Sequence, residues 1–302
     1  MVKGRFAPSP TGRMHLGNVF SALLSWLSAK SKGGEWLLRI EDIDPGRSRQ
    51  AYADLLMDDL DWLGLTWDGV PVYQSRRSDI YEHYYAQLCQ QGLTYPCYCT
   101  RADLLATQAP HESDGRVVYK GTCRHLPPQP GRAAATRLTV PDQAVTFQDG
   151  HYGTMAVNLA TQVGDFIIRR KDGAWAYQLA VVVDDALMGV TEVVRGRDLL
   201  LSSPQQMYIA QLLGFPSPSF VHLPLLCNAD GQRLSKRDSS LDMGSLRQRY
   251  TSADIIGQLA YTANLQPEPC PISPNDLVGH FSWDKVPRQD IIIPHNTTSF
   301  IL

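Results

Sequence analysis

The chain has 302 residues, of which 43% are hydrophobic and 19% charged, a composition typical of a soluble globular protein. No apolar run reaches the roughly 18 residues of a membrane span, and the first ten residues lack the apolar core of a signal peptide. We therefore expect a cytoplasmic monomer without membrane contact. The net charge of −2 excludes a strongly basic nucleic-acid-binding protein, although basic residues cluster locally at 169–171 and 195–197.

The first part of the chain alternates strand and helix patterns. Residues 3–8 are expected to form a short strand, and a turn at 9–17 leads into a helix with leucines at helical spacing. The run 35–44 is apolar and then acidic, as in a buried parallel strand whose C-terminal end carries function. Amphipathic helices are expected at 47–63 and 78–91. This β-α-β-α order predicts an α/β fold with a doubly wound parallel sheet.

The pattern breaks at residue 95 and resumes near residue 161. The stretch 95–160 is rich in Pro, Gly, Cys and His, which indicates an insertion between two halves of the sheet. Strands are expected at 190–196 and 220–226 with a helix at 202–214 between them. The tail is expected to be mostly helical, with a capping box formed by Thr251 and Asp254. The expected domains are thus 1–94 with 161–238, the insertion 95–160, and a helical C-terminal region 239–302.

The stretch PSPTGRMHLGN, at 8–18, has the chemistry of a phosphate site. Pro8 fixes the backbone of a turn, and Gly12 and Gly17 let the main chain approach a ligand closely. The helix that follows offers free N–H groups and a positive dipole, and His15 can donate a further hydrogen bond. A tight turn with a surface histidine explains the same residues equally well.

A second stretch, RLSKR at 233–237, follows an apolar strand, and its Ser235 and Lys236 can stabilise charge on a pyrophosphate. The two stretches together resemble the paired signatures of class I aminoacyl-tRNA synthetases. The blocks GRFAPSPTG, LLRIEDID, YQLAVVVDDALMGVTEVVRG and RLSK narrow the resemblance to the glutamyl-tRNA synthetase group, over roughly residues 3–240. The resemblance implies a Rossmann-like catalytic domain that uses ATP and L-glutamate.

The resemblance also implies a binding site for both substrates. Arginine can hold a carboxylate through its planar fork, and a glutamate side chain can hold an ammonium group. The charged residues of the glutamate site, Arg5, Glu41 and Arg195, are each expected at the C-terminal end of a strand pattern. The implied glutamate-binding residues are Arg5, Ala7, Ser9, Glu41, Tyr177 and Arg195. The implied ATP-binding residues are Pro8, Gly12, His15, Gly17, Asn18, Arg233, Ser235 and Lys236, with His15 and Lys236 catalytic and Mg²⁺ on the phosphates.

A candidate zinc site lies in the insertion. Cys97, Cys99 and Cys123 form a reasonable thiolate set for a tetrahedral site, which would let an irregular segment fold without a large core. Tyrosine is an unusual zinc ligand, so chemistry alone favours His125 as the fourth ligand. The resemblance to the glutamyl-queuosine tRNA(Asp) synthetases, whose pattern is Tyr-x-x-x-Cys, favours Tyr119.

Two features favour that last family over the full-length glutamyl-tRNA synthetases. Leu302 follows soon after the second signature, and Leu199 and Leu200 stand where the full-length enzymes usually place a histidine. The family activates glutamate without tRNA and esterifies it to queuosine in the anticodon loop of tRNA(Asp), so tRNA(Asp) carrying queuosine is the implied partner. The C-terminal region would contact the RNA stem.

Two alternatives remain open. One is a truncated glutamyl-tRNA synthetase that charges the 3′ end of tRNA(Glu). The other is a non-catalytic zinc-containing RNA-binding module, against which the intact His15, Lys236, Glu41 and Arg195 argue.

Overall fold

The computed structural model of the chain describes residues 1–100, 102–103, 118–234 and 241–293. The expected ATP-binding residues Ser235 and Lys236 lie outside these ranges. Within the described residues, none of the helices combines the length and apolar character required to cross a bilayer.

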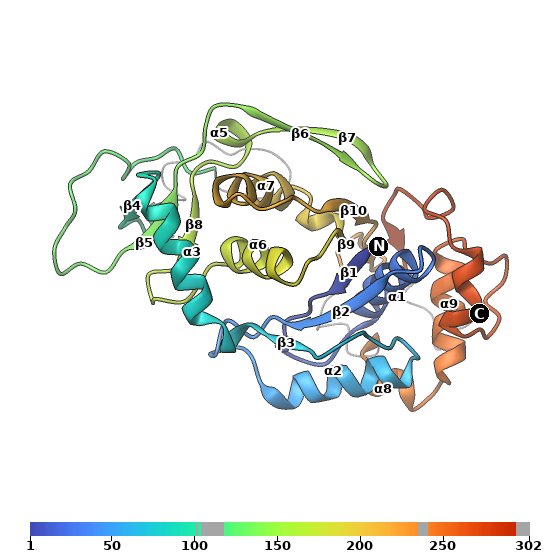
Figure 1. Cartoon of the computed structure of the whole chain (residues 1–302). Helices are drawn as coiled ribbons and strands as arrows, with labels where there is room; N and C mark the ends of the chain where they lie inside the picture. Colours follow the sequence, from blue (N-terminus) through green and yellow to red (C-terminus); the bar gives the residue numbers. More distant parts are fainter. Residues whose placement is uncertain (101, 104–117, 235–240, 294–302) are drawn as a thin grey trace.

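The centre of the fold is a parallel sheet built from two groups of strands (Figure 1). In the first group, β1 (Lys3–Phe6), β2 (Glu35–Ile40) and β3 (Val72–Tyr73) are parallel neighbours. In the second, β9 (Glu192–Gly196) pairs with β10 (Ser219–Leu223), again in parallel. The groups meet where the Thr191 N–H donates to the Lys3 carbonyl at 2.9 Å. Strand order therefore reverses at β1 and β9, which confirms the doubly wound sheet.

Helices cover both sides of this sheet. The helix α1 (Leu16–Lys30) packs on β1 and β9. The apolar residues at helical spacing are fully buried, namely Leu16, Val19, Phe20, Leu23, Leu24 and Leu27. Figure 1 shows α6 (Tyr177–Leu187) and α7 (Ser202–Leu213) on the opposite side from α1. The helices α2 (Gln50–Trp62) and α3 (Ser78–Gln90) occupy the two expected amphipathic segments.

Strand pairing crosses the expected domain boundary at residue 160. The strands β6 (Ala144–Asp149) and β7 (Gly153–Asn158) form a hairpin that joins the central sheet beside β10. Conversely, β8 (Phe166–Arg169) pairs with β5 (Ala135–Leu138), which pairs with β4 (Thr94–Cys97) in a separate antiparallel sheet. The short helix α5 (Leu159–Gln162) connects the two sheets. Local patterns cannot reveal such partners, because they lie far apart in the sequence.

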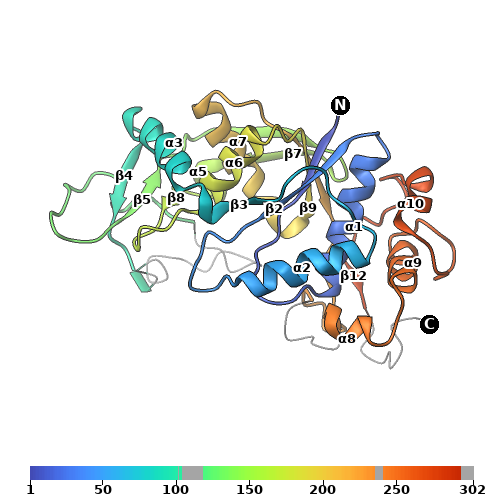
Figure 2. The same ribbon diagram turned by 60° about the horizontal axis from the view of Figure 1, so that its bottom comes forward.

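The C-terminal region packs against α1, as Figure 2 shows. It contains α8 (Met243–Arg247), α9 (Ser252–Thr262) and α10 (Pro274–Leu277), followed by a 3₁₀ turn at Val278–His280. The expected capping box is confirmed, because Thr251 Oγ1 accepts from Asp254 N and Asp254 Oδ2 accepts from Thr251 N. A short strand, β12 (Ile291–Ile292), pairs with β11 (Leu226–Cys227) and ties this region back to the core.

A glycine in α9 provides a test of this packing. A Cβ added at Gly257 would lie 2.1 Å from the Cys270 carbonyl oxygen. Alanine favours a helix over glycine by about 1 kcal/mol, but overpacking of a core costs about 1–3 kcal/mol. We expect Gly257→Ala to lower the free energy of unfolding in urea. Gly279→Ala, where no described atom lies within 4 Å of the added Cβ, is the matched control and should leave stability nearly unchanged.

Candidate active site

A cavity of about 430 Å³ lies at the C-terminal ends of the central strands. Arg5 belongs to β1, Glu41 directly follows β2, and Arg195 lies in β9. Tyr177 is the first residue of α6. The expected site residues that line the cavity are Arg5, Ala7, Pro8, Ser9, Gly12, His15, Asn18, Glu41, Tyr177, Arg195 and Arg233. Gly17 lines a smaller adjoining cavity of about 170 Å³, shared with His15 and Arg233.

His15 caps the start of α1. Its Nδ1 accepts a hydrogen bond from the Gly17 N–H at 3.2 Å, so the ring hydrogen of the neutral imidazole resides on Nε2. Asn18 Oδ1 accepts from the His15 N–H at 3.1 Å and completes the cap. The first turn of α1 holds no acidic side chain, so the positive end of the helix dipole is not neutralised there. This end of the cavity is suited to an anion.

The loop that contains the second signature has both of its described ends at this cavity. Arg233 lines the cavity and forms an ion pair with Asp198. On the other side, Asp242 pairs with His15 in an isolated β-bridge, and the Met243 N–H donates to the Met14 carbonyl at 2.9 Å. The described residues on either side of 235–240 thus lie near the start of α1, although they are far from it in sequence.

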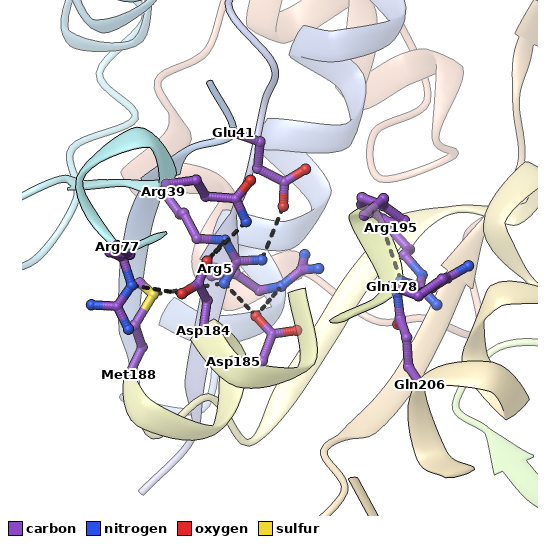
Figure 3. Close-up of polar contacts among 12 residues, drawn as sticks. Arg5, Arg39, Glu41, Arg77, Gln178, Asp184, Asp185, Met188, Arg195 and Gln206 are labelled. Carbon is purple, nitrogen blue, oxygen red and sulfur yellow. Dashed lines mark hydrogen bonds and ion pairs between the residues drawn. The ribbon is translucent and has the colours of Figure 1, made fainter. Parts of the chain in front are cut away.

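Beneath the cavity lies a buried ion network (Figure 3). Arg39, with none of its surface exposed, donates to Asp185 Oδ1 at 2.6 Å and to Glu41 Oε1 at 3.1 Å. Arg5 Nε donates to the same Asp185 oxygen at 3.3 Å. Asp184 Oδ1 accepts a hydrogen bond from Arg77 Nε at 2.7 Å. The network fixes two cavity side chains, Glu41 and Arg5, from below.

The charges of this network shift the pKa values of Asp185, Glu41 and Arg39. Burial alone would raise the pKa of Asp185, but the charges of Arg39 and Arg5 hold it below its usual value. For Glu41, burial dominates and raises the pKa, although Arg39 and Arg5 oppose the rise. The pKa of Arg39 is raised despite burial, because Asp185, Glu41 and Asp184 surround it. Arg39 therefore stays charged and supports the ionised form of Glu41.

Arg195 is held in a different way, by neutral groups. Its guanidinium donates to Gln206 Oε1 at 2.8 Å, to Ser203 Oγ at 2.7 Å and to Tyr177 Oη at 3.4 Å. Its Nε donates to His222 Nε2 at 3.2 Å. Among the described residues Arg195 forms no salt bridge, and burial lowers its pKa. A buried arginine without a carboxylate partner is suited to bind the carboxylate of a ligand.

His222 is itself fixed by a buried carboxylate. Its Nδ1 donates to Asp149 Oδ2 at 2.6 Å, which leaves Nε2 as the acceptor for Arg195. The other oxygen of Asp149 accepts the His151 and Tyr152 N–H groups at 3.0 and 2.9 Å. Asp149 belongs to β6, within the expected insertion, so this hairpin supports the orientation of Arg195.

The sequence did not point to these supporting residues. Arg39 and Asp185 stand inside the blocks LLRIEDID and VVVDD, yet only the structure shows that their charges meet. His222 gave a usable signal, a single polar side chain in an otherwise apolar strand. Asp149 gave none, because its partner is 73 positions away.

The three cysteines of the expected zinc site lie together. The sulfurs of Cys97, Cys99 and Cys123 are within 4.8 Å of one another. The Tyr119 hydroxyl oxygen is 3.6 Å from the Cys97 sulfur and 3.8 Å from the Cys99 sulfur. His125 is exposed and does not belong to this group. Three thiolates and a fourth donor at these separations fit a tetrahedral zinc ion, with Tyr119 as the nearby oxygen donor.

Comparison with known proteins agrees with this geometry. Residues 1–254 match the family model for the catalytic domain of class I tRNA synthetases (E and Q). The structure superposes on a glutamate–tRNA ligase from Elizabethkingia meningosepticum, solved in complex with its amino acid, with a TM-score of 0.81. The two are 27% identical, and the match covers 96% of this chain and 66% of that chain. Fold and site together define a class I aminoacyl-tRNA synthetase catalytic domain.

Relatives with higher sequence identity identify the family more specifically. A protein of Nitratidesulfovibrio vulgaris named glutamyl-Q tRNA(Asp) synthetase is 45% identical over 97% of this chain and 96% of its own length. One of the same name from Neisseria meningitidis serogroup C is 45% identical over 97% of this chain and its own full length. The chain belongs to the glutamyl-Q tRNA(Asp) synthetase family of class I synthetase-like ligases.

The cysteine cluster generates a metal prediction. We expect protein purified without chelator to contain one Zn²⁺ per chain by elemental analysis. Tyr119→Phe should lose zinc faster than the unmodified protein during a chelator challenge, because it removes the oxygen donor beside the sulfurs. His125→Ala should retain zinc normally. Absence of zinc, or the opposite order of the two variants, would contradict this assignment.

His222 generates a pH prediction. Burial, assisted by the positive charge of Arg195, holds the pKa of His222 below its ordinary value of 6.5. As the pH falls through about 6.5 the unfolded chain binds a proton that the folded protein resists, so this contribution to stability is present above that pH and lost below it. His222→Gln, which does not titrate, should flatten the fall in unfolding free energy between about pH 7 and 5 in urea titrations. Equal slopes for both proteins would show that His222 titrates normally.

Proposed function

We propose that the protein activates L-glutamate with ATP, without tRNA, and transfers it to the queuosine of tRNA(Asp). The observation that carries the proposal is the two-ended cavity. One end holds Glu41 and Arg195, which has no carboxylate partner in the described part of the chain, and the other end is the start of α1 capped by His15. The first end complements an amino acid with an extra carboxylate, and the second complements phosphate.

The cavity contains a group of opposite charge for each charged group of glutamate. Glu41, whose carboxylate is supported by Arg39, takes the α-ammonium. Arg195 and Arg5 take carboxylates, and Arg195 is the stronger candidate because Asp185 partly satisfies Arg5. Tyr177 contributes its hydroxyl, while Ser9 and Ala7 line the same wall.

Activation joins the two ends of the cavity. The α-carboxylate of glutamate attacks the α-phosphorus of ATP in line, a new P–O bond forms, and the bond to the bridging oxygen breaks. The products are glutamyl-adenylate and pyrophosphate. His15 Nε2–H, the N–H groups at the start of α1 and the Lys236 ammonium stabilise the negative charge that moves onto the leaving group. Mg²⁺ enters with ATP and neutralises part of the phosphate charge.

Transfer completes the reaction. A hydroxyl of the queuosine cyclopentenediol attacks the acyl carbon of glutamyl-adenylate, an ester forms, and AMP leaves with the bond electrons. The proton of the attacking hydroxyl passes to the departing phosphate or to water. A flexible anticodon loop can present a modified base to such a cavity, as single-stranded RNA elements commonly do.

We assign further properties on the same basis. Zn²⁺ at Cys97, Cys99, Cys123 and Tyr119 has a structural role and holds the segment that follows β4. The C-terminal region 239–302 contacts the RNA stem. The protein works in the cytoplasm as a monomer.

Lys236 supplies a direct test of the activation step. We expect Lys236→Ala to lower glutamate-dependent ATP–pyrophosphate exchange by about 10²-fold or more, the scale of losing one preorganised charge stabiliser. The KM for glutamate should change little, because the lysine acts on phosphate. Lys285→Ala, a lysine on the C-terminal region bonded to the His280 carbonyl, is the control and should exchange normally. Normal exchange in Lys236→Ala would remove this residue from the mechanism.

The acceptor is tested with two forms of the same RNA. The protein should exchange pyrophosphate into ATP with glutamate alone, and should glutamylate tRNA(Asp) isolated with its queuosine. An unmodified transcript of tRNA(Asp) has the same 3′ end but lacks queuosine, so it should not be glutamylated. Equal glutamylation of both RNAs, or charging of tRNA(Glu), would favour the truncated glutamyl-tRNA synthetase. No exchange under any condition would favour a non-catalytic RNA-binding module.

A further inference from the structure

A second cavity lies behind the residues that support Arg195. Its volume is about 330 Å³, and its walls include Tyr119, Arg137 and Ile167 together with Leu201 and Gln205. It lies between the antiparallel sheet of β4, β5 and β8 and the start of α7. The reaction proposed above does not use it.

Arg137 is the unusual feature of this cavity. The residue is only 6% exposed, yet its Nε has no hydrogen-bond partner and it forms no salt bridge among the described residues. Among the described residues, its guanidinium donates a hydrogen bond to the Asp165 carbonyl at 2.6 Å. Its guanidinium lies over the Tyr119 ring, 3.7 Å from the centroid.

The nearest carboxylate does not neutralise Arg137. The two oxygens of Asp165 are taken by Arg124 at 2.7 Å, by the Tyr95 hydroxyl at 2.5 Å and by the Val140 N–H at 2.9 Å. Arg39, which is also buried, is by contrast surrounded by carboxylates. A buried cation that lines a cavity and has no anionic partner among the residues that the structure describes indicates a ligand that supplies oxygen acceptors.

The second cavity is connected to the active site by a chain of three glutamines. Gln205 lines the second cavity and accepts a hydrogen bond from Gln178 at 2.6 Å. Gln178 in turn accepts from Gln206 at 2.9 Å, and Gln206 binds Arg195. The side chains of Gln178 and Gln206 therefore lie between a ligand in this cavity and Arg195 of the proposed glutamate site.

We propose that this cavity binds a nucleotide of the RNA substrate that neighbours the acylated nucleoside. The inference rests on the proposed function. Unstacked bases of RNA loops commonly lie on arginine planes and aromatic rings, and their edges bond to amides. Arg137 supplies the plane and the charge, Gln205 and Gln162 supply amides at the walls, and Ile167 and Leu201 supply apolar surface. The zinc-site residue Tyr119 then has a second role, because its ring supports Arg137.

The test compares Arg137→Gln with Arg132→Gln. Arg132 also stacks on a tyrosine of the same segment, with its guanidinium 5.1 Å from the Tyr98 ring centroid, but it is exposed and does not line the cavity. For both variants we would measure zinc content, glutamate-dependent ATP–pyrophosphate exchange, and glutamyl transfer at varied concentrations of queuosine-containing tRNA(Asp).

Arg137→Gln should retain normal exchange and raise the KM for the RNA by about 10- to 100-fold, the scale of one hydrogen bond to a charged group. If the contact is to a phosphate, the salt dependence of RNA binding should also become shallower by about one charge; if it is to a base, the slope should stay the same. Arg132→Gln should behave like the unmodified protein.

A third variant separates binding from loss of zinc. Ile167→Phe fills the cavity from β8 and leaves the guanidinium in place, so it should also raise the KM for the RNA with zinc retained. Normal RNA kinetics in this variant, or a loss of exchange equal to the loss of transfer in Arg137→Gln, would overturn the proposal. If the unmodified protein fails to transfer glutamate to this RNA at all, the proposed function fails instead.

Discussion

The site depends above all on the buried contact between Arg39 and Asp185. Removing two charges from water is costly unless they meet each other with good geometry, and here they meet at 2.6 Å with no exposure of the arginine. Because Arg39 also holds Glu41, and Asp185 also holds Arg5, a single ion pair sets the positions of two cavity side chains from two strands. The proposed glutamate site thus lies directly above a network in which the charges of arginines and carboxylates balance one another.

The two arginines of the cavity illustrate how charge is allocated. Arg5 shares the negative charge of Asp185, whereas Arg195 is held by a hydroxyl, an amide and a neutral imidazole. Neutral supports fix the orientation of a guanidinium without consuming its charge, so the electrostatic attraction remains for a ligand. Glu41 is held differently, by the charged Arg39 and Arg5, which counter the rise in its pKa that burial causes. The positive charge of Arg195 is therefore the one that the neighbouring described side chains leave for a carboxylate ligand to balance.

Local sequence patterns predicted most of the fold. The leucine spacing after His15, the apolar run before Glu41 and the pair Thr251 and Asp254 each specify a structure within a few residues, and the structure has a helix, a strand and a cap there. The segment Tyr177–Leu187 contains three consecutive valines, which favour a strand, yet it forms helix α6 and is buried on several sides. Partners distant in sequence, such as Asp149 with His222 or Arg39 with Asp185, could not be predicted. Such charge pairs depend on how the strands are arranged in the folded protein.

The β6–β7 hairpin has a consequence for how this enzyme family can be rearranged. In the sequence, the segment 95–160 resembles a replaceable module, because it contains the three cysteines and differs in composition from the segments around it. Its hairpin, however, adds a strand beside β10 and contributes the carboxylate that sets the tautomer of His222. A chimera that exchanged the whole segment would import a foreign strand edge and leave His222 without its partner. A graft that kept residues 144–158 would preserve the active site, so the transplantable unit is shorter than the sequence suggests.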